Sequence, residues 1–240
     1  MPVSIDANTT VRELVGHYPQ CRDVFAEHKI DYCCGGSQTL ERAARDTGTD
    51  VSALVTALEA KLRAAPSGAG PDQRDWYAAP LAELVEHIVR VHHEYMKAAI
   101  PRVEGLLQKV LRAHGANHGK MLAALAEQFQ VLDEDVSNHL MKEERILFPY
   151  IAGLDAKGED RPAACFGTVR GPIGQMEHEH DALGRVLETM RRLTGDYTLP
   201  ADACPTFAAL YDELRRMEAD LHEHIHLENN ILFPRAVGAE

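Results

Sequence analysis

Apolar residues recur along most of this chain at the three- and four-residue spacing of one helix face. No stretch shows the alternation of Val, Ile or Thr that is typical of a half-buried strand. The pattern predicts four long helices, near residues 80–113, 118–149, 172–193 and 205–233. We expect Pro101 to kink the first of them and Pro205 to lie in the first turn of the last. The expected fold is therefore all-α, with the four long helices in an antiparallel bundle.

The helical pattern is interrupted in RAAPSGAGPDQRD, residues 63–75, where Pro, Gly, Ser and charged residues replace the apolar period. This composition is typical of a linker. A chain of 240 residues is long enough for two units. We expect a small helical domain over residues 1–62, a linker over 63–75 and the bundle over 76–240.

Two stretches of the bundle are nearly the same, HLMKEERILFP at 139–149 and HIHLENNILFP at 224–234. Each belongs to an apolar stripe that also contains a histidine and, four residues later, a glutamate. The first stripe consists of Val136, His139, Leu140, Glu143, Ile146 and Leu147. The second consists of Leu221, His224, Ile225, Glu228, Ile231 and Leu232. The ILFP ends predict core packing, followed by a helix stop at Pro149 and at Pro234.

A glutamate on each core-facing stripe needs a cationic partner, because an unpaired buried carboxylate costs several kcal/mol. Lys142 and Arg145 are near the first motif but lie off its stripe, so a protein salt bridge is not the obvious partner. One buried His-x3-Glu pair is more often a hydrogen-bonded core pair than a metal site. Two copies in register, each preceded by a helix with its own histidine, favour a metal.

The other two helices supply one histidine each. In GPIGQMEHEHDALGRVL the stripe contains Ile173, Met176, His180, Leu183 and Leu187, so it selects His180 over His178. In the first helix, periodicity alone leaves both His92 and His93 open. Surface or supporting roles are expected for the remaining histidines named here, which are His17, His28, His87, His114, His118, His222 and His226.

Four histidines and two glutamates on four helices are the ingredients of a carboxylate-bridged dinuclear site. Imidazole and carboxylate ligands without thiolate suit iron, manganese or zinc, and the ligand count disfavours catalytic zinc. Iron is the preferred metal. We expect two non-haem iron ions, bridged by two carboxylates and an oxo or hydroxo group.

A formal net charge of −12 argues against nucleic acid as a partner, because phosphate binding depends on clustered Lys and Arg. No apolar run approaches the length of a membrane span, and the polar start MPVSIDANTTVREL does not resemble a secretory signal. We therefore expect a soluble cytoplasmic protein that binds neither membrane nor nucleic acid. Five cysteines are too few for a disulfide framework in a chain of this size.

Together, these sequence motifs resemble those of a known protein family. Its bundle is similar to the hemerythrin-like proteins, and DYCCGG at 31–36 together with HLENNILFPRA at 226–236 resembles the di-iron iron-sulfur cluster repair proteins, the RIC family. In that family a ligand histidine lies eight residues before a proline, which selects His93 ahead of Pro101. The resemblance implies six metal ligands: His93, His139, Glu143, His180, His224 and Glu228.

The resemblance also implies a function. These proteins are implicated in restoring iron-sulfur clusters damaged by nitric oxide or oxidants, and relatives bind or reduce nitric oxide. The expected partners are nitric oxide or O2 as small ligands, damaged iron-sulfur proteins and an electron donor. A second copy of the chain, in a homodimer, is a further candidate partner. If the centre reduces nitric oxide, Glu179 or Glu177 beside His180 is expected to relay protons. The alternative function is that of a hemerythrin-type reversible O2 or NO carrier or sensor, and a third is a bundle whose metal only stabilises the fold.

The N-terminal domain contains vicinal cysteines, Cys33 and Cys34, in a turn followed by two glycines. Adjacent cysteines cannot form an unstrained disulfide, so we expect this pair to be reactive or to contact a metal. The glycine turn and a helix beginning near Ser37 are expected to lower a thiol pKa. Cys21, Cys165 and Cys204 are expected to be ordinary thiols. The short helices of this domain should pack through Val11, Leu14, Val15, Val24, Phe25 and Ile30.

Overall fold

A computed structural model describes residues 5–64, 74–155 and 166–240. Within these ranges every regular element is a helix, and the β pairing consists of one isolated bridge between Thr10 and Thr39. The prediction of an all-α fold is confirmed. Most of the predicted linker, and Cys165, lie outside the described residues. None of the described helices is long and apolar enough to cross a membrane.

The chain divides into two compact units. The first comprises Met1–Pro80 together with Ile225–Gly238, and the second comprises Leu81–His224 with Ala239–Glu240. The end of the last long helix is therefore part of the same unit as the N-terminal helices.

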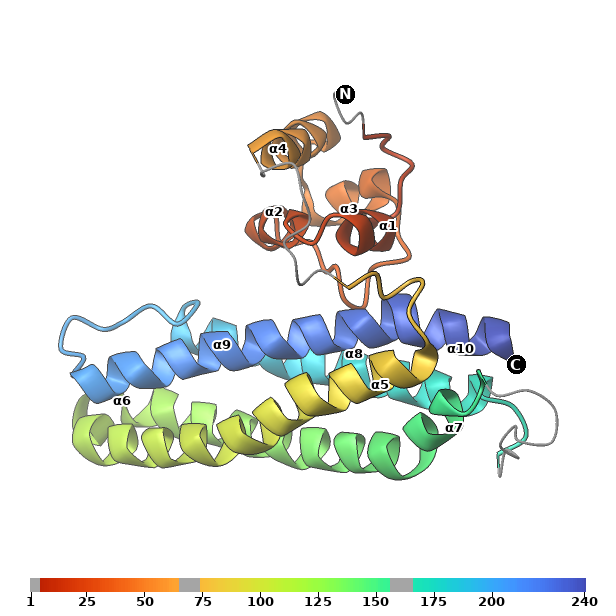
Figure 1. Ribbon diagram of the computed structural model, residues 1–240. Helices are drawn as coiled ribbons and strands as arrows, with labels where there is room; N and C mark the ends of the chain where they lie inside the picture. The colour runs from red at the N-terminus through yellow and green to blue at the C-terminus, as the bar shows by residue number, and fades with distance from the viewer. Residues whose placement is uncertain (1–4, 65–73, 156–165) are drawn as a thin grey trace. The chain divides into compact units, whose positions relative to one another are not determined.

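Four helices form the N-terminal part of the first unit: α1 (Val11–His17), α2 (Cys21–Glu27), α3 (Leu40–Thr47) and α4 (Val51–Ala64) (Figure 1). Thr10 and Glu13 form a capping box at the start of α1, in which each side chain bonds the other residue's backbone N–H. Thr39 caps α3, which ends at Gly48 in the left-handed conformation, with φ of 70°. Short helices such as these depend on caps and on packing, because isolated helices of this length are marginal in water.

A continuous apolar core holds these four helices together. All six side chains predicted to pack there are buried: Val11, Leu14, Val15, Val24, Phe25 and Ile30. They are joined by residues of α3 and α4, namely Leu40, Ala43, Ala44, Leu54 and Leu58. The prediction of this core is confirmed. The segment between Ile30 and α3 forms turns and bends without a helix, so the helix expected near Ser37 begins only at Leu40.

The second unit begins with α5 (Leu81–Ile88), the π-helical turn η1 (Val89–His93) and α6 (Glu94–Lys142). A straight helix of 49 residues would be about 70 Å long. The ends of α6 nevertheless meet, because His93 Nε2 lies 3.5 Å from Glu143 Oε2. Figure 1 shows the chain reversing direction in the lime-green part of α6, and hydrogen bonds from Asn117 and His118 to Asp202 lie in this region. The two arms of α6 thus serve as the first and second bundle helices, although helical geometry continues through the predicted join.

The second arm of α6 continues into η2 (Glu143–Leu147) and α7 (Phe148–Ala152). The third bundle helix is α8 (Arg170–Thr194), and the fourth is α9 (Pro205–Leu227), continued by η4 (Glu228–Leu232) and α10 (Phe233–Ala239). Pro205 is the first residue of α9, as predicted. Helix α6 packs against α8, and α5 packs against α7.

The predicted helix stops at Pro149 and Pro234 are wrong, because helix continues for several residues beyond both prolines. The reason is a change of hydrogen-bond register directly before each one. The Phe148 N–H bonds the Glu143 carbonyl, five residues back, and the Phe233 N–H bonds the Glu228 carbonyl in the same way. The proline that follows lacks an N–H at the point where the ladder returns from the i−5 to the i−4 pattern, so it fits without ending the helix.

The π-helical turn η2 also corrects one member of the first predicted stripe. Ile146 is 50% exposed, whereas Val136, Leu140 and Leu147 are buried. A π turn has more residues per turn than an α-helix, so the position three residues after Glu143 moves off the core face. All members of the second predicted stripe and of the α8 stripe are buried.

Candidate metal centre

The six residues predicted as metal ligands come from all four bundle helices. His93 ends η1, His139 lies in the last turn of α6, Glu143 begins η2 and His180 lies in the middle of α8. His224 lies in α9 and Glu228 begins η4 one turn later on the same continuous helix. Each of the six side chains is at most 1% exposed. Such burial of polar residues is rare unless they are paired or bind a metal.

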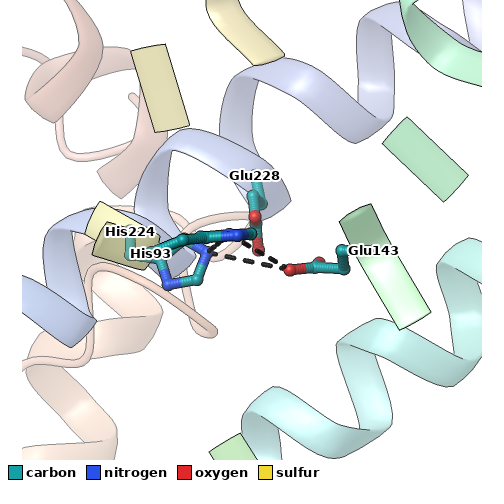
Figure 2. Close-up of side chains that lie close together, drawn as sticks. All are labelled: His93, Glu143, His224 and Glu228. Carbon is teal, nitrogen blue, oxygen red and sulfur yellow. Dashed lines mark hydrogen bonds and ion pairs between the residues drawn. The ribbon is translucent and has the colours of Figure 1, made fainter. Parts of the chain in front are cut away.

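These side chains form two groups, each able to hold a metal ion. The first is His93, His224, Glu143 and Glu228, and the second is His139, His180, Glu143 and Glu228. In each group the ligand atoms lie within 4.8 Å of one another. Figure 2 shows the first group, with both carboxylates directed toward the imidazoles of His93 and His224. Both glutamates belong to both groups, which is the arrangement required of carboxylates that bridge two ions.

Carboxylates outside the cluster orient two of the imidazoles. His93 Nδ1 donates to Glu144 at 2.8 Å, and His139 Nδ1 donates to Glu179 at 2.9 Å. A carboxylate accepts the proton, so it fixes the tautomer in which Nδ1 carries the hydrogen and Nε2 presents a lone pair. Both Nε2 atoms face the interior of the cluster. This is the usual way in which proteins prepare histidine to bind a metal.

The two outer carboxylates are held in their ionised form. Hydrogen bonds from His139, Lys142 and Gln175 outweigh burial and lower the pKa of Glu179 far below its ordinary value. For Glu144, burial is the largest single effect and opposes ionisation, but the hydrogen bonds and charges of Lys97 and His93 together outweigh it and lower the pKa. Each carboxylate thus stays negative beside its imidazole.

The imidazole nitrogens that face inward lie close together in pairs. His93 Nε2 lies 3.1 Å from His224 Nε2, and His139 Nε2 lies 2.9 Å from His180 Nε2. Two nitrogens bound to one ion at about 2.1 Å and at right angles to each other are about 3.0 Å apart. The paired nitrogens therefore have the spacing of neighbouring ligands on a single ion.

Glu143 gives a second test of whether a metal fits. Its side chain is fully buried, and neither carboxylate oxygen accepts a hydrogen bond. The nearest ionisable groups are imidazole nitrogens, with His139 Nε2 at 3.2 Å and His93 Nε2 at 3.5 Å. Lys142, which is next to it in the chain, pairs with Glu179 instead. A buried carboxylate surrounded by nitrogen lone pairs is costly without a cation and well placed with one. The residues present therefore fit a pair of metal ions.

The structure distinguishes His93 from His92, which periodicity left open. His92 Nδ1 bonds Asp220 at 3.0 Å, and its ring stacks on that of His224 at 5.9 Å between centroids. His92 belongs to neither metal-binding group. It packs beside the cluster, and Asp220 is a supporting residue that the sequence reasoning missed. The supporting role of Glu144 was missed by the sequence reasoning as well, although this residue directly follows the proposed ligand Glu143 in the chain.

His226, one of the histidines expected to have a surface or supporting role, is buried, with a side chain only 1% exposed. Its Nδ1 accepts a hydrogen bond from Asn230 Nδ2 at 3.0 Å. Burial lowers the pKa of His226 to about 3, so the ring is neutral. It therefore supports the local structure of the first unit.

The vicinal cysteines lie in a turn organised by Asp31. Its Oδ1 atom accepts hydrogen bonds from the backbone N–H groups of Cys33 and Cys34, both at 2.9 Å. The pKa of Cys33 is well above its ordinary value, because of the hydrogen bond with Cys34, burial and the Asp31 charge. For Cys33 the expectation of a lowered pKa is wrong. The helix whose N-terminus was expected to lower it begins farther along the chain.

Comparisons with known proteins agree with this geometry. The family model described as the hemerythrin HHE cation binding domain matches residues 84–236. The chain belongs to this family. A second model, ScdA_N, described as a domain of unknown function, matches residues 7–62.

Curated relatives extend the match to almost the whole chain. The iron-sulfur cluster repair protein YtfE of Musicola paradisiaca is 42% identical over 232 residues, which cover 95% of this chain and 96% of the relative. The proteins of the same name from Dickeya chrysanthemi and Escherichia coli O81 are 40% and 39% identical over 229 residues, with the same shares covered. The chain is thus a member of the iron-sulfur cluster repair protein family, and the resemblance read from its motifs is confirmed.

Proposed function

We propose that this protein is a di-iron protein that takes part in the repair of iron-sulfur clusters damaged by nitrosative or oxidative stress. The observation that carries the proposal is the pair of buried groups that share Glu143 and Glu228, within a chain whose relatives are named as cluster repair proteins. His93 and His224 would hold one ion, and His139 and His180 the other.

The protein's own residues have separate tasks at this centre. Glu143 and Glu228 would supply the negative charge that a pair of divalent ions needs, and they approach the cluster from two different helices (Figure 2). Glu144 and Glu179 hold the imidazoles of His93 and His139 with Nε2 directed inward. Glu179 contacts His139 and Lys142, so its structural task is to position a ligand; a part in proton transfer stays a prediction.

When bound, the metal pair would supply two electrons and two neighbouring positions for a small ligand such as nitric oxide. The reaction that fits is the conversion of two nitric oxide molecules, two electrons and two protons to N2O and water. Holding both reactants side by side in a buried site lowers the entropic part of the barrier. The low exposure of all six proposed ligands keeps bulk water from competing.

The proposal is tested in bacterial cells that lack their own cluster repair protein. After exposure to nitric oxide, we expect the wild-type protein to restore the activity of a [4Fe–4S] dehydratase, and Glu143→Gln and His180→Ala to fail. His222→Ala is the matched control, because His222 lies in α9 two residues from His224 but in neither metal-binding group. Full restoration by Glu143→Gln, or failure of the wild-type protein, would overturn the proposal.

A separate measurement asks whether nitric oxide is consumed. The fully reduced protein, mixed with two equivalents of nitric oxide, should release about one N2O for every two irons. Uptake of nitric oxide without N2O would reject the reductase step and favour the reversible carrier or sensor. Iron delivery to the damaged cluster would then be the route to repair.

A further inference from the structure

We propose that Asp31, Cys33 and Cys34 form a second metal site, which takes one divalent transition-metal ion in tetrahedral coordination and leaves one position for a ligand from outside the chain. The site lies within the first unit and shares no residue with the bundle centre. Metal binding at this site does not depend on the proposed function. A role of the site in moving iron during cluster repair would rest on that function.

The first argument is the spacing of the ligand atoms. The oxygen and sulfur atoms offered by these three residues lie within 4.8 Å of one another. The two sulfur atoms are 3.8 Å apart, far from the disulfide bond length of about 2.05 Å. Two sulfur ligands at about 2.3 Å from a tetrahedral ion are about 3.8 Å apart. The thiols are therefore separated as they would be on one ion.

The second argument is that the turn fixes all three ligands before any ion binds. Asp31 Oδ1 accepts the backbone N–H groups of both cysteines, and the Cys33 thiol donates to the same oxygen at 3.1 Å. These bonds place the carboxylate beside the sulfurs and restrict both cysteine backbones. Fixed ligands lose little conformational freedom when an ion binds, which favours affinity.

Residues of η4 also hold the backbone of the same turn, through hydrogen bonds to its carbonyl groups. Asn230 Nδ2 donates to the carbonyls of Tyr32 and Cys33, at 3.2 and 3.1 Å, and Asn229 Nδ2 lies 3.4 Å from the Cys33 carbonyl. Gly36 leaves room for this contact, because a Cβ atom there would lie 2.2 Å from Asn230 Oδ1. The turn is thus tied to a helix within its own unit.

Exposure makes the site suitable for exchange with a partner. Asp31 is exposed, Cys34 is partly exposed and Cys33 is 6% exposed. Three protein ligands would leave the fourth tetrahedral position open, and open positions are typical of sites that bind or exchange a further ligand. Two thiolates and one carboxylate suit zinc and ferrous ions among the divalent metals.

Metal binding has a defined proton balance. In the free turn the Cys33 thiol donates a hydrogen bond to Asp31 Oδ1 at 3.1 Å, so its sulfur carries a proton. An entering divalent ion replaces the protons of both thiols: M²⁺ and two thiols give the dithiolate complex and two protons. No electron is transferred, so no oxidant or reductant is needed.

The test uses the full-length protein with its bundle centre already loaded with iron, kept anaerobic and titrated with Co²⁺. We expect one Co²⁺ per chain with thiolate-to-cobalt charge-transfer absorption, the strong visible bands of a tetrahedral ion and release of about two protons. Cys33→Ser and Cys34→Ser should lose the sulfur absorption. Cys204→Ser is the matched control and should keep it.

Asp31→Asn separates metal binding from folding of the turn, because the asparagine Oδ1 still accepts the two backbone hydrogen bonds but the charge is gone. We expect Co²⁺ affinity to fall by about tenfold or more, with the far-ultraviolet circular dichroism unchanged. Absence of sulfur-bound cobalt in the wild-type protein, or its persistence when both cysteines are serine, overturns the proposal. Glu143→Gln should retain this cobalt spectrum while failing in cluster repair, so failure of the second site and failure of the proposed function give different results.

Discussion

At the scale of single residues, the direction of an imidazole decides whether it can bind a metal. His92 and His93 are both buried and adjacent in the chain, yet only His93 presents Nε2 to the cluster. The difference lies in the partner of Nδ1, which is Glu144 for His93 and Asp220 for His92. Outer carboxylates therefore belong to the candidate metal site, because they orient its imidazoles without being members of either ligand group.

Replacing either outer carboxylate should weaken metal binding. We expect Glu144→Gln and Glu179→Gln each to lower iron affinity by about 10- to 100-fold, because the imidazole loses its fixed orientation and negative partner. Competition with a chromophoric chelator measures the change. Glu177→Gln is the control, since Glu177 lies in the same helix but is exposed. Equal losses in all three variants would show that surface charge, and not ligand orientation, controls affinity.

Cys204 gives a prediction that is independent of the metal. A hydrogen bond from His114 and backbone N–H groups of Phe207 and Thr206, at the start of α9, lower the pKa of this thiol to about 7. Burial raises the pKa of Cys21 to about 11. The thiolate of Cys204 is thus present above about pH 7, so alkylation by iodoacetamide at pH 7.5 should modify Cys204 before Cys21. This pH lies above the pKa of Cys204 and far below the pKa of Cys21. His114→Ala should shift the midpoint of the Cys204 rate profile to higher pH, as peptide mass spectrometry would measure; an unchanged midpoint would contradict this assignment.

At the scale of elements, the π-helical turns connect the helix pattern with the site. Three of them are found in the described bundle helices, and each has a proposed ligand at one end: His93 in η1, Glu143 in η2 and Glu228 in η4. A π turn accommodates one extra residue in a wider turn, so the sequence spacing of the buried positions shifts by one residue across it. The turns therefore allow the apolar side chains of a helix to face the core and the proposed metal ligands of the same helix to face the cluster.

Removing one residue from η1 should impair the placement of a proposed ligand while the helix keeps its core packing. Deletion of Val91 is expected to convert the wider π turn to ordinary helix and to displace His93, the last residue of that turn, from its position in the cluster, with loss of at least one iron per chain. Val91 is 37% exposed, so Val91→Ala keeps the helix length and serves as the control. Iron analysis after purification distinguishes the two variants. Full iron content in the deletion variant would show that the π turn is not needed for ligand placement.

At the scale of the whole molecule, metal binding and folding are linked. Residues that are far apart in the chain, such as His93 and His224, are brought to 3.1 Å, and both nitrogens lie in the buried interior. A ligand that binds only the folded state adds to the free energy of unfolding by mass action. The same cluster without metal keeps a buried carboxylate, Glu143, which opposes folding.

Glu143→Gln should therefore change stability in opposite directions with and without metal. In the metal-free protein we expect the free energy of unfolding to rise by about 1–3 kcal/mol, because a neutral amide replaces a buried charge and can donate to imidazole nitrogens. In the iron-loaded protein the denaturation midpoint should fall, because a proposed metal ligand is lost. Urea unfolding with and without a chelator measures both. A decrease in both states would mean that Glu143 is stabilising without metal.

The sequence by itself determined the fold class, the core of the N-terminal helices and most buried faces of the bundle. These follow from apolar periodicity, and the buried Val11, Leu14 and Phe25 of the N-terminal core agree with it. Periodicity also placed His139, Glu143, His180, His224 and Glu228 on buried faces, because a helical stripe carries every side chain at its spacing toward the core.

Tertiary structure decided what helical spacing leaves open. The distinction of His93 from His92 depends on Glu144 and Asp220, which come from other helices. The exposure of Ile146 and the continuation of helix past Pro149 depend on a π turn, which a regular period does not contain. The raised pKa of Cys33 depends on its burial and on the position of Asp31 in a folded turn. A one-dimensional pattern encodes which face of an element is buried, whereas ligand orientation, register changes and local electrostatics arise only when separate elements meet.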